Sequence, residues 1–346
     1  MFLRNYWYVA AGADEVRETP LARTILNEPV VLYRTKSGTP VAFSDRCPHR
    51  GMPLSLGIVD DDRLQCRYHG LTFGPDGRCV HIPGQARIPK DAAVRQFAVF
   101  ERYGLIWIWP GDASVADASE AFTFEPLERP GWDASQLHFH NAFDWRLLVE
   151  NLMDFTHLTF VHGTTIGGRE VAEEAEVKST RDGDRVRTTR WMFDIPPAPT
   201  YERALGTNAN VDRWQIIDFH PPSYITVNAG VAPAGTGAPE GSREGALERF
   251  SMHSITPETE RSTHYFWTSA FDPAAHDAEM IKMLSEQFRQ AFSEDVEILE
   301  YQQERRLDDE LLIDTVNDAG NLQVRRIMDR LAAGEKEAQM PLQASG

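Results

Sequence analysis

The chain has 346 residues, 42% hydrophobic and 10% aromatic, with a formal net charge of −17 at pH 7. This length suffices for roughly two ordinary domains, and the composition is that of a globular protein rather than a disordered one. Residues 1–115 carry 14 Lys and Arg against 12 Asp and Glu, whereas the remainder is strongly acidic. This balance argues against nucleic acid as a partner; it favours an acidic partner docking on the N-terminal part, or solubility alone.

The N-terminal run MFLRNYWYVAAGADEV is too short in apolar residues for a secretory signal, and no apolar window of membrane-spanning length follows. Three cysteines are an odd and low number, typical of a reducing compartment in which thiols serve as ligands. We therefore expect a cytoplasmic protein without a membrane span, in which Cys79 is a small buried side chain.

Short β-rich runs separated by Gly, Pro and Asp turns occupy the first 110 residues, among them 29–35, 40–45 and 97–110. This pattern predicts a small antiparallel barrel or sandwich. We assign this all-β domain to residues 1–115.

Two Cys–His pairs fall on loops of this domain. Cys47 precedes His49 by two residues, and Cys66 precedes His69 by three. A structural zinc site is one alternative, but zinc modules usually pair Cys with Cys and His with His. Two thiolates on one iron and two imidazoles on the other suit a [2Fe–2S] cluster with a potential of roughly −150 to +300 mV. The spacing resembles the Rieske fingerprint.

The pattern changes after residue 116 to helices mixed with long strands. A helical segment covers 144–162, and strands are predicted at 185–195, 213–231, 246–256 and 262–271. Further helices are predicted from about 275 to 306 and near 324–335. This order indicates an α+β domain, residues 116–346, with an antiparallel sheet flanked by helices.

The first helical segment contains Asp154, His157 and His162 in the order D-x₂-H-x₄-H. On a regular helix the two histidines differ by about 140° in direction. They bind one metal only if the helix widens, bends or ends near them, and Gly163 favours an ending. Two histidines of an amphipathic helix without a metal are the alternative.

A candidate third ligand is Asp295, which lies beside the apolar stripe of the long C-terminal helix. Its neighbour Glu294 has the position of an exposed helix carboxylate. Two histidines and one carboxylate form the facial triad of mononuclear non-haem Fe(II), which leaves sites open for O₂.

Four blocks of the chain resemble the Rieske non-haem iron oxygenases, and the resemblance covers nearly its whole length. CPHRGMPLSLG, CRYHGLTFGPDGRCVHIPGQ, ENLMDFTHLTFVH and FSEDVEILEYQQ are most similar to the vanillate O-demethylase oxygenase group. The resemblance implies a Rieske cluster and a mononuclear Fe(II). Their ligands would be Cys47, His49, Cys66 and His69 for the cluster, and His157, His162 and Asp295 for the iron.

The resemblance also implies a homotrimer in which one subunit's cluster lies near the next subunit's iron. Asp154 would accept hydrogen bonds from His69 of the partner subunit and from His157 of its own, and would belong to the catalytic machinery. Electrons would come from NAD(P)H through a separate flavin and ferredoxin-type reductase. The implied reaction is O-demethylation of a methoxylated aromatic acid with release of formaldehyde. Ring hydroxylation, N-demethylation and a plain Rieske electron carrier stay open.

Candidate substrate contacts are few. Asn228 and His253 are polar residues of predicted strands, where alternation would aim them at a common pocket, and an ordinary strand position is the alternative. Asn151 is a third candidate, behind the iron ligands at most. The sequence alone identifies no Lys or Arg that would bind a substrate carboxylate. An acidic substrate is therefore implied only by the resemblance.

Overall fold

The computed structural model describes residues 2–238, 240–273, 278–306 and 312–339. It divides into two compact units, Met1–Phe122 with Thr256–Glu260, and Thr123–Ile255 with Arg261–Gly346. The boundary expected at residue 115 lies a few residues before the division at 122. The short return of residues 256–260 to the first unit has no signal in the sequence.

The first unit is built from two antiparallel sheets, in agreement with the predicted all-β domain. The larger sheet has the strand order β1 (Tyr8–Gly12), β10 (Leu105–Trp109), β9 (Gln96–Arg102), β4 (Pro40–Ser44), β3 (Glu28–Arg34) and β2 (Leu21–Ile25). The smaller sheet consists of β5 (Ile58–Asp60), β6 (Arg63–Gln65), β7 (Thr72–Phe73) and β8 (Cys79–His81).

Strand β3 separates two apolar cores because successive side chains of a strand point to opposite faces. Val30 and Leu32 pack into the first core, with residues of β1 and β10. Val31 and Tyr33 pack into the second core, which also contains the two cysteines of the Cys–His pairs. The larger sheet thus supports the loops that carry these pairs.

The second unit contains one seven-stranded antiparallel sheet. Its strand order is β11 (Asp133–Asn141), β17 (Ser262–Phe271), β16 (Leu247–Thr259), β15 (Tyr224–Pro233), β14 (Val211–His220), β13 (Arg185–Ile195) and β12 (Glu176–Asp182). The predictions of strands at 185–195 and 262–271 are confirmed, and the single run 213–231 is a hairpin of β14 and β15.

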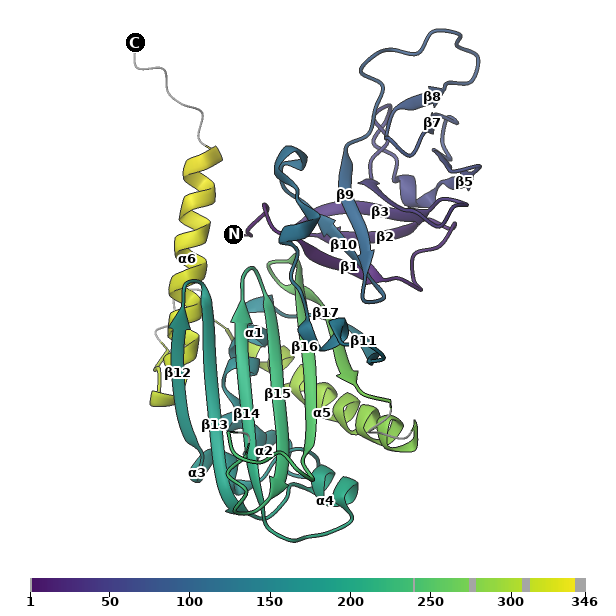
Figure 1. The fold of residues 1–346 in the computed structure, drawn as a ribbon. Coiled ribbons are helices and arrows are strands. Elements are labelled where there is room, and N and C mark those ends of the chain that lie inside the picture. The colour runs from purple at the N-terminus through teal and green to yellow at the C-terminus, as the bar shows by residue number, and fades with distance from the viewer. Residues whose placement is uncertain (1, 239, 274–277, 307–311, 340–346) are drawn as a thin grey trace, which may run out of the picture. The chain divides into compact units, whose positions relative to one another are not determined.

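The helices of this unit are α1 (Trp145–Met153), α2 (Leu158–Val161), α3 (Arg169–Glu173), α4 (Pro199–Leu205), α5 (Ala278–Arg305) and α6 (Ala319–Gln339). The expected start of the long helix near residue 275 falls outside the described residues. Figure 1 shows α1, α2 and α5 behind the sheet. None of the helices in the described ranges is long and apolar enough to cross a membrane.

The strand register decides which side chains meet the helices. Arg190, Gln215, Ala229 and Arg249 are successive partners across β13, β14, β15 and β16. Direct partners in an antiparallel pair lie on the same face. This row lies on the helix-covered face, because Gln215, Ala229 and Arg249 border a cavity together with residues of α5.

Candidate functional site

The two Cys–His loops have the same backbone structure. In each, the cysteine amide donates to the carbonyl five residues later, and the amide four residues later donates back to the cysteine carbonyl, at 2.8–3.0 Å. The fourth residue is Gly51 in one loop and Gly70 in the other, with φ of 70° and 72°. Only glycine adopts this left-handed conformation at little cost. The equal loops therefore present Cys47 and Cys66 in equivalent ways.

The side chains of these loops offer two kinds of metal ligand, cysteine sulfurs and histidine nitrogens. Cys47 and Cys66 are buried, at 1% and 2% exposure, and burial raises the pKa of the Cys47 thiol. His49 and His69 are exposed, and their ring centroids are 4.6 Å apart. Inner sulfurs and outer imidazoles suit a cluster in which one iron takes two thiolates and the other two nitrogens.

The segment 144–162 does not form one helix. Helix α1 ends at Met153, and the Asp154 carboxylate then accepts a hydrogen bond from the Thr156 amide, capping a 3₁₀ turn that ends at His157. Helix α2 follows at once and ends one residue before His162. The change from α1 to the 3₁₀ turn, together with the end of α2, lets two histidines five positions apart approach each other.

The loop after His162 depends on a glycine other than the expected one. The Gly167 amide donates to the His162 carbonyl at 2.8 Å. A Cβ at Gly167 would lie 2.1 Å from the Leu158 carbonyl oxygen, so no larger residue fits. The helix does end beside Gly163, as expected, because His162 is the C-cap of α2. A Cβ at Gly163 would meet nothing closer than 3.9 Å, so the position that has no room for a side chain is Gly167.

Asp295 of α5 lies opposite the two histidines. Its side chain is buried, and its Oδ1 is 3.0 Å from His162 Nε2 and 3.3 Å from His157 Nε2. One donor atom from each residue falls within 4.8 Å of the others. Burial alone would raise the pKa of Asp295, but its hydrogen bonds to both histidines outweigh this and lower that pKa to about 2.

The far nitrogens of both histidines are held by oxygen atoms. His157 Nδ1 donates to the main-chain oxygen of Asp154, and His162 Nδ1 donates to the Glu294 carboxylate, each at 2.7 Å. Oxygen atoms of these kinds only accept, so each Nδ1 carries a proton. Each Nε2, which faces Asp295, is then the nitrogen that can bind a metal in place of its contact with the carboxylate. The donor set fits a divalent iron of the two-histidine, one-carboxylate type.

Glu294 was missed in the sequence, where it had the position of an exposed carboxylate. Its side chain is 27% exposed, and it also accepts a hydrogen bond from Gln290 at 3.0 Å. A general rule points to it: a metal-binding histidine usually donates its second nitrogen to an oxygen nearby.

The prediction that the Asp154 carboxylate accepts from His157 was wrong, because the main-chain oxygen of Asp154 does so. The carboxylate instead accepts from the Thr156 amide and hydroxyl and pairs with Arg190, which is only 1% exposed. Burial lowers the pKa of Arg190, and the Asp154 charge opposes this effect.

Asn151 lies against the candidate iron ligands His157 and Asp295. Its Nδ2 is 3.1 Å from Asp295 Oδ1 and 3.4 Å from His157 Nε2. Its Oδ1 is buried without a hydrogen-bond partner among the described residues. Asn151 therefore contacts the candidate metal ligands directly.

A cavity lies beside the three candidate iron ligands. Its empty volume is about 470 Å³, part of which is open to solvent. His157, His162 and Asp295 form one wall. The other lining residues are mostly apolar: Leu152, Phe155, Leu158, Ile166, Val227, Ala229, Phe288 and Phe292, with Tyr201, Arg213, Gln215, Arg249 and His253. The cavity is a mainly apolar, partly aromatic chamber, and the three candidate metal ligands form one of its walls.

Of the two strand residues expected to contact substrate, His253 lines this cavity and Asn228 does not, among the residues described. Asn228 is the register partner of Ile216 and Phe250, on the face away from the helices, and its amide bonds Trp214 and Glu248. Neighbouring residues of a strand point to opposite faces, so Asn228 points away from the cavity that Ala229 lines.

His253 is enclosed by polar partners. Its ring nitrogens lie 3.0 Å from Ser251 Oγ and 2.7 Å from the Tyr265 hydroxyl. Burial, assisted by the positive charge of Arg249, lowers the pKa of His253 to about 3. The ring is therefore neutral at pH 7.

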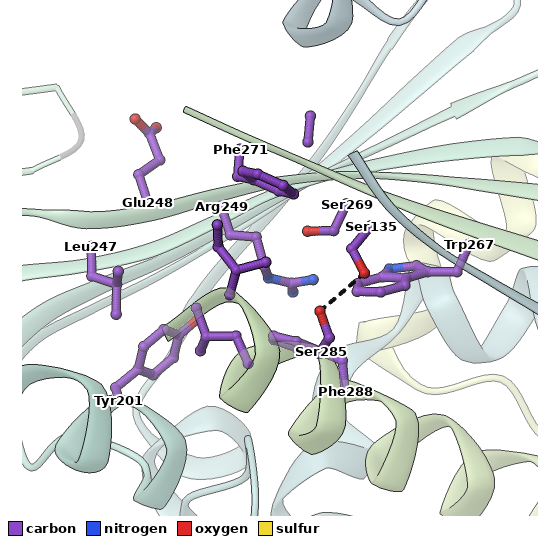
Figure 2. Close-up of a pocket in the computed structure, with 13 residues that line it drawn as sticks. Ser135, Tyr201, Leu247, Glu248, Arg249, Trp267, Ser269, Phe271, Ser285 and Phe288 are labelled. Atoms are coloured by element: carbon purple, nitrogen blue, oxygen red, sulfur yellow. Dashed lines mark hydrogen bonds between the residues drawn. The ribbon is translucent and has the colours of Figure 1, made fainter. Parts of the chain in front are cut away.

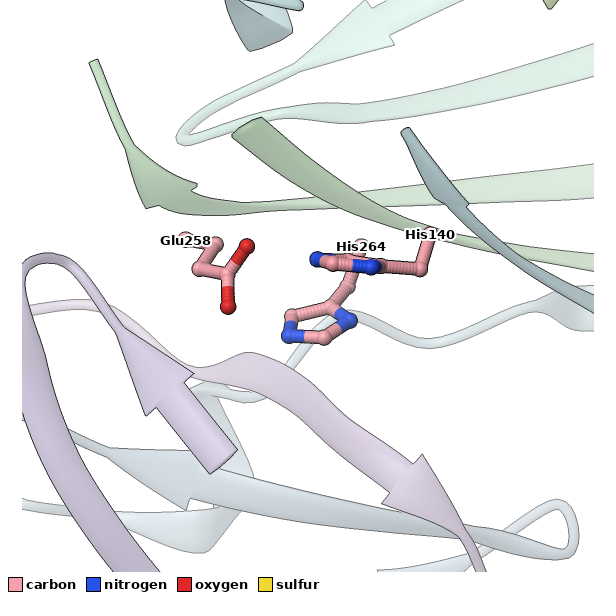
Figure 3. A group of neighbouring side chains, drawn as sticks. All are labelled: His140, Glu258 and His264. Carbon is pink, nitrogen blue, oxygen red and sulfur yellow. The ribbon is translucent and has the colours of Figure 1, made fainter. Parts of the chain in front are cut away.

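Other histidines lie on the opposite side of the same sheet. His140 and His264 are register partners on β11 and β17, and their rings stack with centroids 4.9 Å apart (Figure 3). His138 stacks on Phe266 at 4.3 Å. In these contacts the three histidine rings pack against other aromatic rings of the sheet.

Comparison with known proteins confirms the resemblance seen in the motifs. The family model "Rieske [2Fe-2S] domain" matches residues 6–98, and "Vanillate O-demethylase oxygenase C-terminal domain" matches residues 142–334. The vanillate O-demethylase oxygenase subunit of Pseudomonas sp. (strain HR199 / DSM 7063) is 41% identical over 98% of this chain and 97% of its own.

Two further relatives show the same full-length match. A toluene-4-sulfonate monooxygenase system iron-sulfur subunit of Comamonas testosteroni is 37% identical over 99% of this chain and 100% of its own. The crystal structure of dicamba monooxygenase bound to 3,6-dichlorosalicylic acid superposes with a TM-score of 0.90, at 34% identity, over 98% of this chain and 99% of that one.

Proposed function

Since the chain belongs to the Rieske non-haem iron oxygenases, we propose that it is a terminal oxygenase component that O-demethylates a methoxylated aromatic acid such as vanillate. Members of this family contain a Rieske [2Fe–2S] cluster and non-haem iron and receive electrons from a separate reductase. The observation that carries the proposal is the cavity whose metal-binding wall faces aromatic and aliphatic side chains.

The proposed ligands are those expected from the sequence. Cys47, Cys66, His49 and His69 would hold the cluster, which the equal loop structures support. His157, His162 and Asp295 would hold the iron, which the orientation of their donor atoms supports. When bound, these groups supply electron delivery and O₂ activation.

The residues around the iron ligands would orient the reaction. Apolar side chains such as Phe292 and Val227 exclude water from the cavity, while Glu294 and the Asp154 carbonyl keep both histidines in the metal-binding tautomer. One O₂, two electrons and two protons would place one oxygen atom in a methoxy C–H bond and release one water. The resulting hemiacetal splits into a phenol and formaldehyde.

The assembly would be a homotrimer in the cytoplasm. A separate flavin and ferredoxin-type reductase would supply its electrons. The exposed ring of His69 supports electron transfer to another subunit, and the Asp154 side chain is 23% exposed. Light scattering on the purified protein tests the trimer, and a monomer with full activity would contradict it.

The test of the function is an assay with a suitable reductase, NADH and a panel of methoxybenzoates, arylsulfonates, benzoates and N-methyl compounds. We expect one formaldehyde per O₂ with vanillate or a close analogue. The variant His162→Ala should keep the cluster spectrum and release no formaldehyde.

Other products would change the assignment. A cis-diol from an unmethylated arene would indicate a ring-hydroxylating dioxygenase, and formaldehyde only from N-methyl compounds would indicate an N-demethylase. A holoprotein with cluster iron alone would be a Rieske electron carrier.

A further inference from the structure

A half-buried arginine on β16, Arg249, has no ion pair with a carboxylate among the described residues. The Nε and Nη1 atoms of Arg249 are buried and have no hydrogen-bond partner among the described residues. The guanidinium lies over the Phe288 ring, 3.5 Å from its centroid. A buried polar group without a partner is rare and calls for an explanation.

Arg249 borders two hollows at once. One is the cavity of the candidate metal ligands. The other is lined mainly by apolar residues, and its polar lining includes Ser135, Ser269, Ser285 and Glu248. Figure 2 shows the guanidinium pointing into this second hollow, on the side of Ser269 and Ser285. The Arg249 side chain thus forms part of the wall of both hollows.

A second arginine lines the metal-side cavity. Arg213 on β14 is 3% exposed, and its Nη2 donates to the Ile166 carbonyl at 2.7 Å. Its Nε is buried without a partner among the described residues, and its guanidinium lies 5.3 Å from the centre of the Tyr201 ring. Two guanidinium groups therefore share one chamber.

Two nearby carboxylates are already engaged, and a third, Glu170, acts on Arg213 through its charge without an ion pair among the described residues. Asp295 contacts both histidines and Asn151. Glu248 pairs with Arg243 and binds the Asn228 amide. The two cations therefore have no negative charge bonded to them in the described residues, and an unpaired buried charge is costly to keep.

We propose that Arg249, with Arg213 beside it, receives the anionic carboxylate or sulfonate group of an aromatic substrate. The inference rests on the proposed function, because it takes this cavity as the substrate site. A guanidinium binds such groups through two parallel hydrogen bonds, and Phe288 holds its plane from one side. With the anion held there, the ring would extend along the apolar walls toward His157, His162 and Asp295.

The protonation state agrees with this role. Burial lowers the pKa of Arg249 to about 10, and burial also lowers the pKa of Arg213. A pKa near 10 leaves Arg249 charged at neutral pH, so it can attract an anion.

The test is the binding of three ligands to the holoprotein by isothermal titration calorimetry. Vanillate carries a carboxylate, 4-hydroxy-3-methoxybenzenesulfonate a sulfonate, and vanillamide neither. We expect the wild type to bind at least one anion roughly 10–100-fold more tightly than the amide, and Arg249→Gln to lose most of this difference. The control Arg203→Gln changes an exposed arginine of α4 and should bind like the wild type. Sulfonate and carboxylate affinities show which anion is preferred.

A stability measurement separates ligand binding from a structural role. Without ligand, Arg249→Gln should melt at the same or a higher temperature, because a half-buried charge without an ion-pair partner is removed. Arg249→Lys keeps the charge without the planar fork and should bind anions with intermediate affinity.

Two results would overturn the inference: a wild type that binds vanillamide as tightly as both anions, or an Arg249→Gln variant that weakens all three ligands equally and melts earlier. Failure of the proposed function looks different. In that case anions would still bind through Arg249, while no methoxyarene would yield formaldehyde.

Discussion

Glu294 accepts a hydrogen bond from Nδ1 of the buried His162 at 2.7 Å, on the side of the ring opposite to Asp295. Two consecutive residues of α5 thus contact both nitrogens of one imidazole. Although burial lowers the pKa of His162, its hydrogen bonds to Asp295 and Glu294 outweigh this and raise it. The pair of carboxylates sets both the orientation and the tautomer of the ring.

Removing the Glu294 carboxylate should weaken iron binding at the proposed mononuclear site. We expect Glu294→Ala to lower iron affinity by about 10–100-fold, because His162 loses the acceptor that fixes its tautomer. Glu294→Gln keeps a neutral oxygen that can accept from His162 Nδ1, so it should lose less iron affinity than Glu294→Ala. Chelator competition measures the affinity. Glu297→Gln, an exposed position on the same helix, is the control, and equal affinities in all variants would contradict the role.

Replacing one buried thiol should remove the cluster and leave the mononuclear iron. Cys66→Ser should lose the visible absorption and the EPR signal of the reduced cluster, since serine is a poor ligand for this centre. Cys79→Ser should keep both, because the Cys79 thiol is bonded to the His81 carbonyl at 3.4 Å. A colourless wild type that contains zinc would disprove the assignment.

Asp154→Asn should retain both metals and slow electron transfer. Asparagine keeps the cap on the Thr156 amide, so the turn should fold, but it removes the charge that pairs with Arg190. Changes behind metal ligands usually cost about 10–100-fold. Rapid mixing of reduced protein with substrate and O₂ measures cluster oxidation, and an unchanged rate would remove Asp154 from the electron path.

His253 should make the protein less stable in acid. The pKa of His253 is about 3 in the folded protein against 6.5 ordinarily, so between these values the unfolded chain binds more protons. The contribution of the neutral, buried His253 ring to the free energy of unfolding is therefore complete above pH 6.5 and is lost as the pH falls toward 3. The slope is at most about 1.4 kcal/mol per pH unit.

Urea unfolding at pH 7, 5.5 and 4.5 measures this contribution. His253→Gln should reduce the fall in unfolding free energy between these values, whereas His81→Asn, at an exposed histidine, should not. Identical pH profiles for the wild type and His253→Gln would show that burial of His253 does not govern its protonation.

Local patterns were enough to predict much of the fold. Strands 185–195 and 262–271 have the predicted bounds, because alternation and flanking turn residues act over a few positions. The Cys–His spacing likewise depends on two short loops, each closed by its own glycine. Such features need no information about distant parts of the chain.

The helix-covered face of the sheet was decided only by tertiary packing. Alternation determines that Asn228 and Ala229 point to opposite faces, but not which face the helices cover, so Asn228 was a wrong candidate and Arg249 was overlooked. Likewise, the Asp154 carboxylate pairs with Arg190, 36 positions away, and Glu294 meets His162 from another helix. These partners depend on how elements pack, because side-chain contacts between distant segments follow from the rotation and depth of each element and leave no short-range pattern in the sequence.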